Sequence, residues 1–463
     1  MAISSEDRGQ WSSKLGFVMA AAGSAIGLGN IWRFPYTAGE GGGGAFVLLY
    51  LLFVALIGIP VMLAELSVGR ATKRNPVGAF KALVPKSLWP AVGGLGVATG
   101  FGILAFYSVV AGWTLGYLVK AFTGGLASAT SGAASGAIFA ELVASPGPAI
   151  LYTALFLVLT ILIVRGGVSG GIERASKVLM PLLLVVLIVL AIRSITLPGG
   201  MDGLIYLFHP DFSKISFGVA MSALGQALFS LSLGMGAMIT YGSYFPEKTN
   251  LWQSGIIVAF FDTMIAILAG LIIFPALFYQ NMDPQGGPGL VFITLPTIFN
   301  AMPAGTLFGI AFYFLLSIAA LTSTISLLEV VVSYFVDERG WTREKASWVL
   351  GFICFLLAVP SALSQGGSAL LSAKSEANPG GLFAWDFLTI NNNIWGNYSL
   401  SIGAILICVF VGWKWGIPKA LASLEEGGYR LPASPAWSFL IRYLCPLAVL
   451  AVLIFIVVTG QYF

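Results

Sequence analysis

Charged residues are scarce in this chain of 463 residues. Aspartate, glutamate, lysine and arginine make up 9% of the sequence, and hydrophobic residues make up 58%. A soluble globular domain carries roughly 25% charged residues, which it needs to cover its surface. A very large soluble core does not explain the shortage, because apolar runs of about 18 residues or more recur along the whole chain. The composition therefore predicts an integral membrane protein.

Several chemical signatures are also missing. Cys354, Cys408 and Cys445 lie in apolar runs or at their edges and form no C-x-x-C pair, which argues against a disulfide framework and a zinc site. The only histidine, His209, cannot form a zinc site alone and is interpreted as part of a loop. The sequence has no P-loop, H-E-x-x-H or G-x-S-x-G motif, so an enzyme is a poor interpretation. The polar N-terminus runs into a full span, so we expect no cleavable signal peptide.

The apolar segments predict an all-α polytopic fold with about eleven transmembrane helices. The predicted spans are 12–37, 42–69, 88–121, 147–165, 172–193, 217–245, 252–279, 304–336, 345–364, 382–413 and 436–460. Residues 281–300 are an outer loop whose apolar stretch is too short to span, and we expect it to be a re-entrant or lid-like loop at the mouth of a cavity.

Lysine and arginine predict the orientation, because short loops rich in these residues stay in the cytoplasm. With the N-terminus inside, most of the 23 lysine and arginine residues fall in cytoplasmic segments. An odd number of spans then places the C-terminus outside. We expect a multi-pass protein of the cell's inner (plasma) membrane, and its net charge of +4 needs no nucleic-acid partner.

Two predicted spans carry glycine-rich interruptions. The first has Gly23, Gly27 and Gly29, and the sixth reads FSLSLGMG at 229–236. Because backbone in hydrocarbon must be hydrogen-bonded internally, an unwound segment persists only beside a protein cavity or water. Interruptions five spans apart indicate a five-plus-five inverted repeat with a transport site between the broken helices. The predicted division is an N-terminal segment at 1–11, repeats at 12–193 and 217–413, and a last span at 436–463.

The broken ends offer groups for both a carboxylate and a cation. Free N–H groups at a helix N-terminus suit a carboxylate, and free carbonyls suit a hard cation such as Na⁺. Close helix packing through glycine is the alternative for one such cluster. Two clusters at matching places favour a site, since Ser24 and Asn30 lie in one and Ser230 and Ser232 in the other.

The motifs of these spans resemble the neurotransmitter:sodium symporter family. They are GSAIGLGNIWRFP at 23–35, EGGGGAF at 40–46, GWTLGY at 112–117, FSLSLGMG at 229–236, ITYGSY at 239–244, FITLP at 292–296 and ALTSTISLLE at 320–329. The likeness covers essentially the whole chain and is strongest to bacterial, eleven-span members that carry several hydrophobic amino acids. It implies Na⁺-coupled symport of an amino acid by alternating access.

The resemblance also implies two Na⁺ sites made only of oxygen ligands, which a hard cation prefers. The first would use the carbonyl of Ala25 with Asn30, Ser230, Asp262 and the substrate's own carboxylate. The second would use the carbonyls of Gly23, Ile26 and Ala319 with the hydroxyls of Thr322 and Ser323. Without the resemblance, membrane serines and threonines more often bond to backbone or across a helix interface.

Substrate contacts are implied in the same way. The N–H groups of Leu28 and Gly29 and the hydroxyl of Tyr107 would bind the carboxylate. The carbonyls of Ala25, Phe229 and Ser230 and the hydroxyl of Ser232 would bind the amine. The side-chain pocket would be lined by Ile103, Tyr107, Phe229, Met235, Ser323 and Leu327.

Gly27 discriminates between substrate classes. Monoamine-transporting relatives have an aspartate at this position, which substitutes for the carboxylate that their substrates lack. A glycine therefore implies a substrate with its own carboxylate. We expect bulky hydrophobic L-amino acids, aromatic ones included, because Met235 is unbranched and adaptable.

Asp262 lies inside the seventh predicted span, where an ionisable side chain is costly and marks a functional hypothesis. Chloride-dependent relatives bind the anion at positions matched by Tyr50, Gln226 and Ser230, plus a serine where this chain has Ala266. The carboxylate of Asp262 would replace the anion, so we expect chloride-independent transport, with Asp262 a candidate for protonation on the return step. The alternative is a protonated carboxyl that only bonds a nearby serine or tyrosine.

Two charged pairs resemble the gates of the family. Arg33 and Asp386 would form the outer gate, and Arg8 and Asp337 the inner gate, with Trp11 and Tyr244 beside it. For the outer pair, the alternative is that each is an ordinary interfacial charge whose side chain reaches water. For Arg8, the alternative is that its charge only helps to orient the chain in the membrane.

Gly171 and Pro181, at the start of the fifth predicted span, resemble a feature of the family that is linked to unwinding on the cytoplasmic side. An ordinary helix start with a mild kink is the alternative. Glu65 and Glu329 are interpreted as hydrogen-bonding residues inside the bundle without a role in transport.

The predicted protein is thus a monomeric symporter whose partners are Na⁺, a hydrophobic L-amino acid and the lipid bilayer. A non-transporting amino acid sensor on the same scaffold is the first alternative. An ion channel is the second, although the sequence has no filter-like repeat or charged ring.

Overall fold

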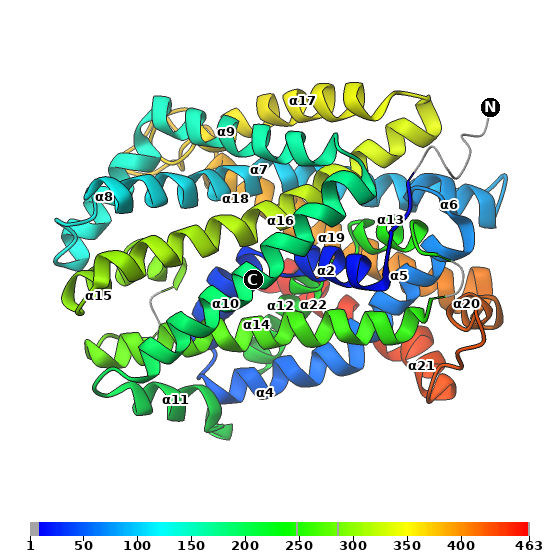
Figure 1. Ribbon diagram of the computed structural model, residues 1–463, viewed down its shortest axis with the longest axis horizontal. Helices are drawn as coiled ribbons and strands as arrows, with labels where there is room; N and C mark the ends of the chain where they lie inside the picture. The colour runs from blue at the N-terminus through cyan, green and yellow to red at the C-terminus, as the bar shows by residue number, and fades with distance from the viewer. Residues whose placement is uncertain (1–8, 247–248, 285–286, 462–463) are drawn as a thin grey trace.

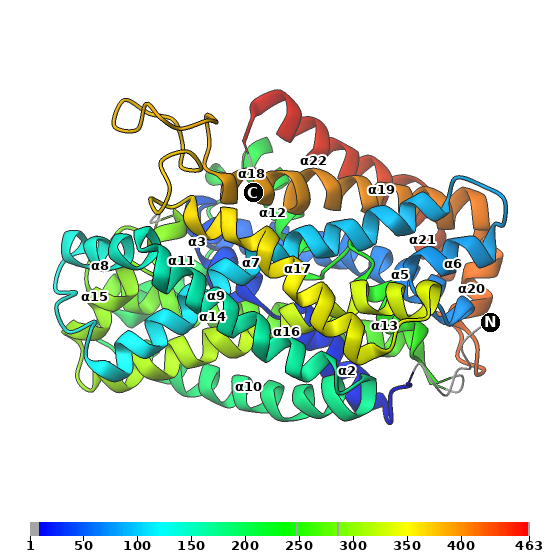
Figure 2. The same cartoon turned by 90° about the horizontal axis from the view of Figure 1, so that it is seen from above.

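The computed structural model describes residues 9–246, 249–284 and 287–461 of the chain. Within these ranges the chain is mainly helical, and most long helices run along the longest axis of the molecule in both views (Figure 1 and Figure 2). Among the described residues, nine helical segments are long and apolar enough to cross a membrane. The predicted all-α polytopic fold is confirmed.

The nine long segments are single helices or helices continued through π-helical turns. The single helices are α7 (Pro90–Thr123), α9 (Pro146–Val164), α14 (Leu251–Tyr279), α16 (Gly305–Arg339) and α17 (Arg343–Leu363). The continued ones are α4 (Gly44–Phe53), η2 (Val54–Gly58) and α5 (Ile59–Thr72); η3 (Val168–Glu173) and α10 (Arg174–Ile195); α18 (Phe387–Asn391), η6 (Asn392–Ser399), α19 (Leu400–Val409), η7 (Phe410–Gly416) and α20 (Ile417–Leu424); and α21 (Ser434–Phe439), η8 (Leu440–Leu444) and α22 (Cys445–Thr459).

Two predicted spans are interrupted. The first consists of α2 (Lys14–Ala25), then η1 (Gly29–Arg33) and α3 (Phe34–Glu40), with a bend of 50° at the break. The sixth consists of α12 (Phe217–Ser230) and α13 (Ala237–Ser243). The remaining short helices are α6 (Pro76–Leu83), α8 (Gly132–Ala144), α11 (Gly200–Phe208), η4 (Phe212–Lys214), η5 (Gly287–Leu290) and α15 (Thr294–Ala301). The division into two repeats stays a prediction.

Polar residues just before the helices determine where several of them begin. Ser13, Ser216, Asn250 and Thr342 each accept a hydrogen bond from the backbone N–H three residues later, at the starts of α2, α12, α14 and α17. Asp386 does the same for α18, because its Oδ1 accepts from the N–H of Thr389 at 3.0 Å. The predicted start of the tenth span at 382 is therefore wrong, since the helix begins only after this cap.

The inner half of the sixth span, α13, packs very closely against α5. A Cβ atom on Gly69 would lie 2.0 Å from the carbonyl oxygen of Ile239, so a glycine is required at this contact. Small residues let membrane helices approach in this way, and the close approach holds α13 against the second span.

Large apolar side chains cover the outside of the bundle. Val178, Val185 and Ile192 of α10 and Leu447 and Val457 of α22 are all exposed. An apolar surface of this kind is unsuitable for water and suits the hydrocarbon of a bilayer.

The loop predicted at the mouth of a cavity carries η5 and α15 in its described part, and its action as a lid stays a prediction. The backbone oxygen of Phe292 accepts from the hydroxyl of Tyr117 at 2.7 Å, and its ring stacks on Phe139 at 5.4 Å between centroids. Asn300 donates to the backbone oxygens of Leu126 and Ala129. These contacts pack the loop against α7 and α8, and Phe292 lines a cavity on the side predicted to face outwards.

Candidate functional site

The two predicted helix breaks are present and lie against each other. In the first break, Ile26 leaves the helical conformation, with ψ of 106°. In the second, Ser232, Gly234 and Gly236 have φ values of 54°, 78° and 76°, a region that favours glycine. The hydroxyl of Ser232 donates to the carbonyl oxygen of Ser24 at 2.9 Å and so joins the two breaks.

Buried polar side chains satisfy the backbone at both breaks. Glu65 of α5, fully buried, accepts from the N–H of Gly234 at 2.7 Å. Gln226 of α12 donates to the carbonyl oxygen of Gly29 at 2.7 Å. The interpretation of Glu65 as a hydrogen-bonding residue is confirmed, but the sequence did not indicate that its partner is the second break. An acidic residue in an apolar span was the only available signal.

The groups predicted to bind a carboxylate meet at Gly27. The N–H of Leu28 donates to the Tyr107 hydroxyl at 2.8 Å, which leaves the hydroxyl proton available to a ligand. A Cβ atom on Gly27 would lie 2.2 Å from Oγ of Ser323 and 2.7 Å from Oη of Tyr107. The absence of a side chain at Gly27 therefore keeps this point open.

A small pocket of about 20 Å³ adjoins these groups. Its lining residues are Ser24, Ala25, Gly27, Gly29, Ile103, Tyr107, Phe229, Ser232, Met235, Ser323, Ser326 and Leu327. The predicted substrate residues line it except for Leu28, which lines the outer cavity, and Ser230, which turns towards Asp262. The predicted substrate contacts did not include Ser24, which was named only as a residue of the first break, or Ser326, which lies one helical turn after Ser323.

Asp262 is the centre of a buried hydrogen-bond cluster beside this pocket. Its Oδ1 accepts from Asn30 Nδ2 at 2.7 Å, and its Oδ2 accepts from the hydroxyls of Ser230 at 2.8 Å and Tyr50 at 3.1 Å. Asn30 Oδ1 accepts from the N–H of Gly27 at 3.0 Å. Three side chains of the first predicted Na⁺ set are thus in mutual contact and present oxygen atoms.

Most of the second predicted Na⁺ set also converges. The Thr322 hydroxyl lies 3.0 Å from the Ala319 carbonyl oxygen and 3.3 Å from that of Ile26, and a Cβ atom on Gly23 would lie 3.3 Å from Thr322 Cβ. The Ser323 hydroxyl donates instead to the carbonyl oxygen of Ser24 at 3.4 Å. The alternative that these hydroxyls bond to backbone therefore describes the contacts present here, while the same oxygens could hold a cation.

A larger cavity, of about 380 Å³, lies on the outer side of the pocket. Tyr107 and Phe229 line both spaces and form the partition between them. The predicted outer gate residues line it too. The Arg33 guanidinium stacks 4.4 Å from the Phe229 ring centroid, whereas Asp386 accepts from Gln365 at 2.7 Å. Arg33 and Asp386 thus face one cavity without pairing in the described structure.

The side predicted to face the cytoplasm is closed by Trp11 and Tyr244. Trp11, only 2% exposed, donates from its backbone N–H to the oxygen of Tyr244 at 3.2 Å and from Nε1 to the oxygen of Tyr241 at 3.0 Å. Asp337 accepts two bonds from Asn75, and its predicted partner Arg8 lies outside the described residues. A cavity on one side of the pocket and a closed opposite side are therefore both present in this structure.

A buried ion pair reinforces the inner closure. The Tyr244 hydroxyl donates to Glu329 at 2.5 Å, and Arg343 at the start of α17 binds the same carboxylate at 2.6 Å. Glu329 is fully buried. The sequence interpretation gave Glu329 no role in transport and overlooked Arg343, yet both contact the predicted gate residue or its partner.

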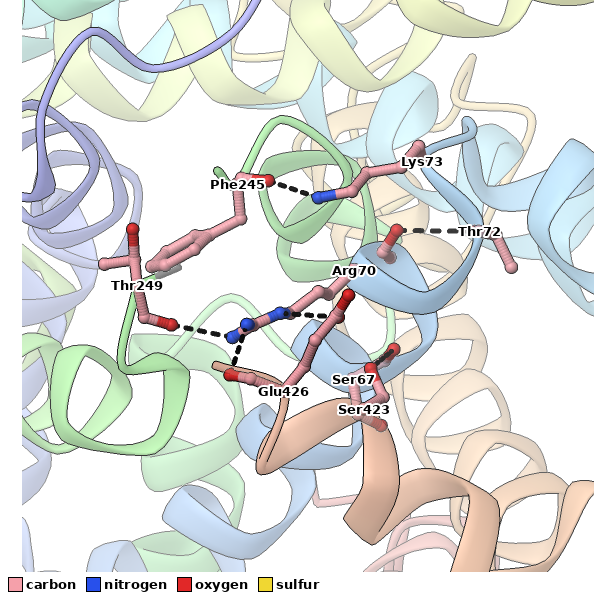
Figure 3. Close-up of polar contacts among 9 residues, drawn as sticks. Ser67, Arg70, Thr72, Lys73, Phe245, Thr249, Ser423 and Glu426 are labelled. Atoms are coloured by element: carbon pink, nitrogen blue, oxygen red, sulfur yellow. Dashed lines mark hydrogen bonds and ion pairs between the residues drawn. The ribbon is translucent and has the colours of Figure 1, made fainter. Parts of the chain in front are cut away.

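Arg70 and Lys73 connect three segments at the same end (Figure 3). The Arg70 guanidinium, which is buried, donates to the carboxylate of Glu426 at 3.1 Å and to the backbone oxygens of Glu426 at 2.6 Å and Thr249 at 2.8 Å. Lys73 donates to the backbone oxygen of Phe245. The end of α5 is thereby fastened to the segment after α13 and to the loop after α20. From the sequence, the positive charge of these residues was interpreted only as a signal for membrane orientation.

The predicted unwinding segment is helical in this structure. Gly171 lies in η3, where a Cβ atom would be 2.1 Å from the carbonyl oxygen of Ile163, and Pro181 lies inside α10. Its unwinding stays a prediction.

Known proteins are similar to this chain over nearly its whole length. The profile described as "Sodium:neurotransmitter symporter family" matches residues 8–136 and 138–462. The "Uncharacterized sodium-dependent transporter YhdH" of Bacillus subtilis (strain 168) is 41% identical over 96% of this chain and 96% of its own length. The "Sodium-dependent serotonin transporter" of Drosophila melanogaster is 27% identical over 98% of this chain and 77% of its own. The crystal structure of MhsT in complex with L-phenylalanine is similar with a TM-score of 0.87 and 46% identity, covering 96% of this chain and 99% of that one.

A side chain at Gly27 should disable the pocket. Gly27→Ala forces the groups of Ser323 and Tyr107 apart, and overpacking of this kind costs about 1–3 kcal/mol, which corresponds to roughly 5- to 150-fold in affinity. Binding of labelled leucine in Na⁺ measures the effect. Gly94→Ala is the matched control, because a Cβ atom there meets nothing within 4 Å. Equal affinity in both variants would contradict the assignment of this pocket.

Removing Arg343 should destabilise the inner closure. Arg343→Gln leaves the Glu329 carboxylate buried without its cation, which costs about 3–5 kcal/mol. We expect a clearly lower thermal midpoint, followed by tryptophan fluorescence. Arg339→Gln removes an exposed arginine at the end of α16, four residues earlier, and should leave the midpoint nearly unchanged. Identical midpoints for the two variants would show that the buried pair contributes nothing.

Proposed function

Because this chain belongs to the sodium:neurotransmitter symporter family, we propose that it couples two Na⁺ ions to the uptake of hydrophobic L-amino acids by alternating access. It is a multi-pass membrane transporter that depends on sodium, and not an enzyme. The number of ions, the hydrophobic substrate and the lack of a chloride requirement are the finer parts of the proposal.

The arrangement around Gly27 is the observation that carries the choice of an amino acid. The Leu28 N–H and the Tyr107 hydroxyl lie at the N-terminal end of the outer half of the first span, where the helix dipole favours an anion. No aspartate side chain occupies position 27 to replace a substrate carboxylate. MhsT, which is similar in fold and sequence, has been crystallised with an amino acid, L-phenylalanine.

The pocket lining favours a hydrophobic side chain. Ile103, Phe229, Met235 and Leu327 line it together with small and hydroxyl-bearing residues, and no charged side chain is among the described lining residues. A charged substrate side chain would lose its hydration there without a compensating partner. The 20 Å³ volume is too small for a bulky amino acid, so binding requires Phe229 or Met235 to move.

Na⁺ and substrate would stabilise each other. The predicted first Na⁺ set, Ala25, Asn30, Ser230 and Asp262, leaves one position for the substrate carboxylate. A shared ligand makes the two affinities mutually dependent by thermodynamic linkage. In the second set, the carbonyls of Gly23 and Ile26 belong to the first span and Thr322 to α16, so an ion there would hold these two elements together.

Transport would then proceed by exchange of the two closures. Na⁺ and the amino acid enter through the outer cavity, and Arg33 and Asp386 approach above Tyr107 and Phe229. The contacts of Trp11, Tyr244 and Glu329 open on the other side. The proposed setting is the inner (plasma) membrane, with a monomer whose N-terminus is in the cytoplasm and whose C-terminus is outside.

Asp262 supports chloride independence. Its carboxylate lies beside the predicted first Na⁺ set, within bonding distance of Tyr50 and Ser230, two of the positions that would otherwise hold an anion. Ala266, one turn later, offers no hydroxyl to chloride. A fixed negative charge at this place supplies what the anion supplies elsewhere.

Ligand binding tests the substrate class. We expect labelled tryptophan or leucine to bind in Na⁺ but not in K⁺, and unlabelled hydrophobic L-amino acids to compete. Tryptamine, which lacks the carboxylate, should compete at least about 100-fold more weakly than tryptophan, because the carboxylate donors stay unpaired. Equal competition by tryptamine would overturn the proposed role of Gly27 and Tyr107.

Counterflow in proteoliposomes separates a carrier from a sensor. A carrier loaded with unlabelled leucine accumulates labelled leucine from outside, whereas a sensor binds it without accumulation. We expect accumulation in Na⁺.

Replacement of chloride tests Asp262. Uptake should be unchanged when gluconate replaces chloride, whereas Asp262→Asn should lower uptake more than about tenfold, since it removes a buried charge that the Na⁺ set requires. Asp202→Asn removes an exposed aspartate in α11 and serves as the control. A sharp fall of wild-type uptake in gluconate would show that chloride is needed.

A further inference from the structure

The start of the fifth span has little intrinsic helical stability. Gly166, Gly167, Gly170 and Gly171 lie in or just before η3, and glycine weakens a helix. Pro181 has no N–H for the carbonyl oxygen four residues earlier, so α10 loses a backbone bond in its second turn. Contacts from outside the helix must therefore hold this segment in its helical form.

Glu173 supplies such contacts to the beginning of the first span. Its carboxylate is 1% exposed and accepts from the N–H of Ser12 at 2.7 Å, from the Ser12 hydroxyl at 2.5 Å and from the Ser13 hydroxyl at 3.1 Å. Lys177, one turn later on the same helix, pairs with it at 2.6 Å. One carboxylate thus binds two elements that are 161 residues apart in the chain.

The N-terminus of α2 is built to receive this carboxylate. A Cβ atom on Gly16 would lie 1.9 Å from Oε1 of Glu173, so only glycine leaves room for it. Ser13 is the N-cap of α2 and accepts from the N–H of Gly16 at 3.0 Å. A negative charge at the N-terminus of a helix is favourable, so Glu173 stabilises α2 as well as its own segment.

The same two helices lie together beside the proposed second Na⁺ set further along. Gly23 and Ile26 lie at the end of α2, and a Cβ atom on Gly23 would be 3.4 Å from the sulfur of Met180 in α10. Between them lies an apolar cavity of about 130 Å³, lined by Met19, Ala22, Ile26, Met180, Pro181, Leu184, Phe261 and Ile265. Figure 2 shows α2 and α10 side by side along this region. Packing is therefore incomplete here, and the polar contact of Glu173 carries more of the attachment.

We propose that Glu173 is a positioning residue for the second Na⁺ set, whose carboxylate latches the N-terminus of α2 to the start of α10. The latch has to open before Na⁺ leaves towards the cytoplasm. Lys177 belongs to the same helix as Glu173, so the carboxylate keeps a cation when Ser12 and Ser13 move away. Opening separates the two serines from the carboxylate and removes the support of a weak helix start. This inference rests on the proposed Na⁺-coupled alternating access.

A purely structural role for Glu173 is the competing explanation. A contact that is equally strong in every state of the transporter would stabilise the fold and leave Na⁺ affinity unchanged. A latch present only in the outward-facing state shifts the population of that state, and the apparent Na⁺ affinity follows the population.

Hydrogen exchange and Na⁺ titration of the full-length protein separate these explanations. In wild-type protein, amides of 166–181 should exchange more slowly in Na⁺ than in K⁺. In Glu173→Gln, exchange in Na⁺ should rise towards the K⁺ level, and half-maximal leucine binding should need roughly fivefold more Na⁺, while binding at saturating Na⁺ is retained. Ser12→Ala, which leaves α10 untouched, should shift both measurements in the same direction by a smaller amount.

Glu344→Gln is the matched control. Glu344 lies in the first turn of α17 and pairs at 3.7 Å with Arg165 on the exposed surface. It should change neither measurement. The proposal is overturned if Glu173→Gln and Ser12→Ala lower only the thermal midpoint and leave exchange at 166–181 and the Na⁺ requirement as in wild type. Failure of wild-type protein to bind leucine in Na⁺ would instead overturn the proposed function, and the comparison of exchange between variants would still test the latch.

Discussion

Backbone groups inside a bilayer must find partners within the protein, and the two helix breaks depend on this constraint. An unsatisfied N–H or carbonyl in hydrocarbon costs several kcal/mol. Glu65 satisfies Gly234, Gln226 satisfies Gly29, and Ser232 joins the second break to Ser24. These bonds between distant residues allow the chain to leave the helical conformation at mid-membrane, and the proposed site exists because of them.

The groups that remain available at the breaks have the chemistry of the proposed ligands. The Tyr107 hydroxyl accepts from the Leu28 N–H and keeps its own proton for a ligand at Gly27, and the oxygens of Asn30, Ser230 and Asp262 gather nearby. Donors and carbonyls occur at opposite ends of one interruption, so a carboxylate and a cation can bind next to each other. A single structural device therefore accounts for both halves of Na⁺-coupled binding.

The closures on the two sides differ in strength. At the larger cavity, Arg33 stacks on Phe229, and Asp386 accepts a hydrogen bond from Gln365. These residues line the cavity but do not close it. On the inner side, a tryptophan, a buried ion pair and the clamp around Arg70 hold the helices together. Since the contacts around Trp11 and Tyr244 are buried and include an ion pair, opening them requires compensation from contacts made in another arrangement.

The sequence by itself determined the membrane class, the helical fold and the two breaks, because these depend on local composition and on motifs that are continuous in the chain. The residues around the pocket were expected only from the resemblance to the family. It also indicated Asp262 and Glu65 as costly charges in apolar spans. Only the tertiary structure decided which groups the buried charged side chains meet. Glu65 reaches a residue 169 positions away, Glu173 one 161 positions away, and Arg70 one 356 positions away. Hydrogen-bond partners are determined by which residues lie close together after the helices pack. Neither the periodicity of the sequence nor the spacing of its motifs indicates which residues these are. For the same reason Glu329 and Arg343, which lie in an apolar span and in a basic loop of the sequence, could be recognised as part of the inner closure only once Tyr244 was seen beside them.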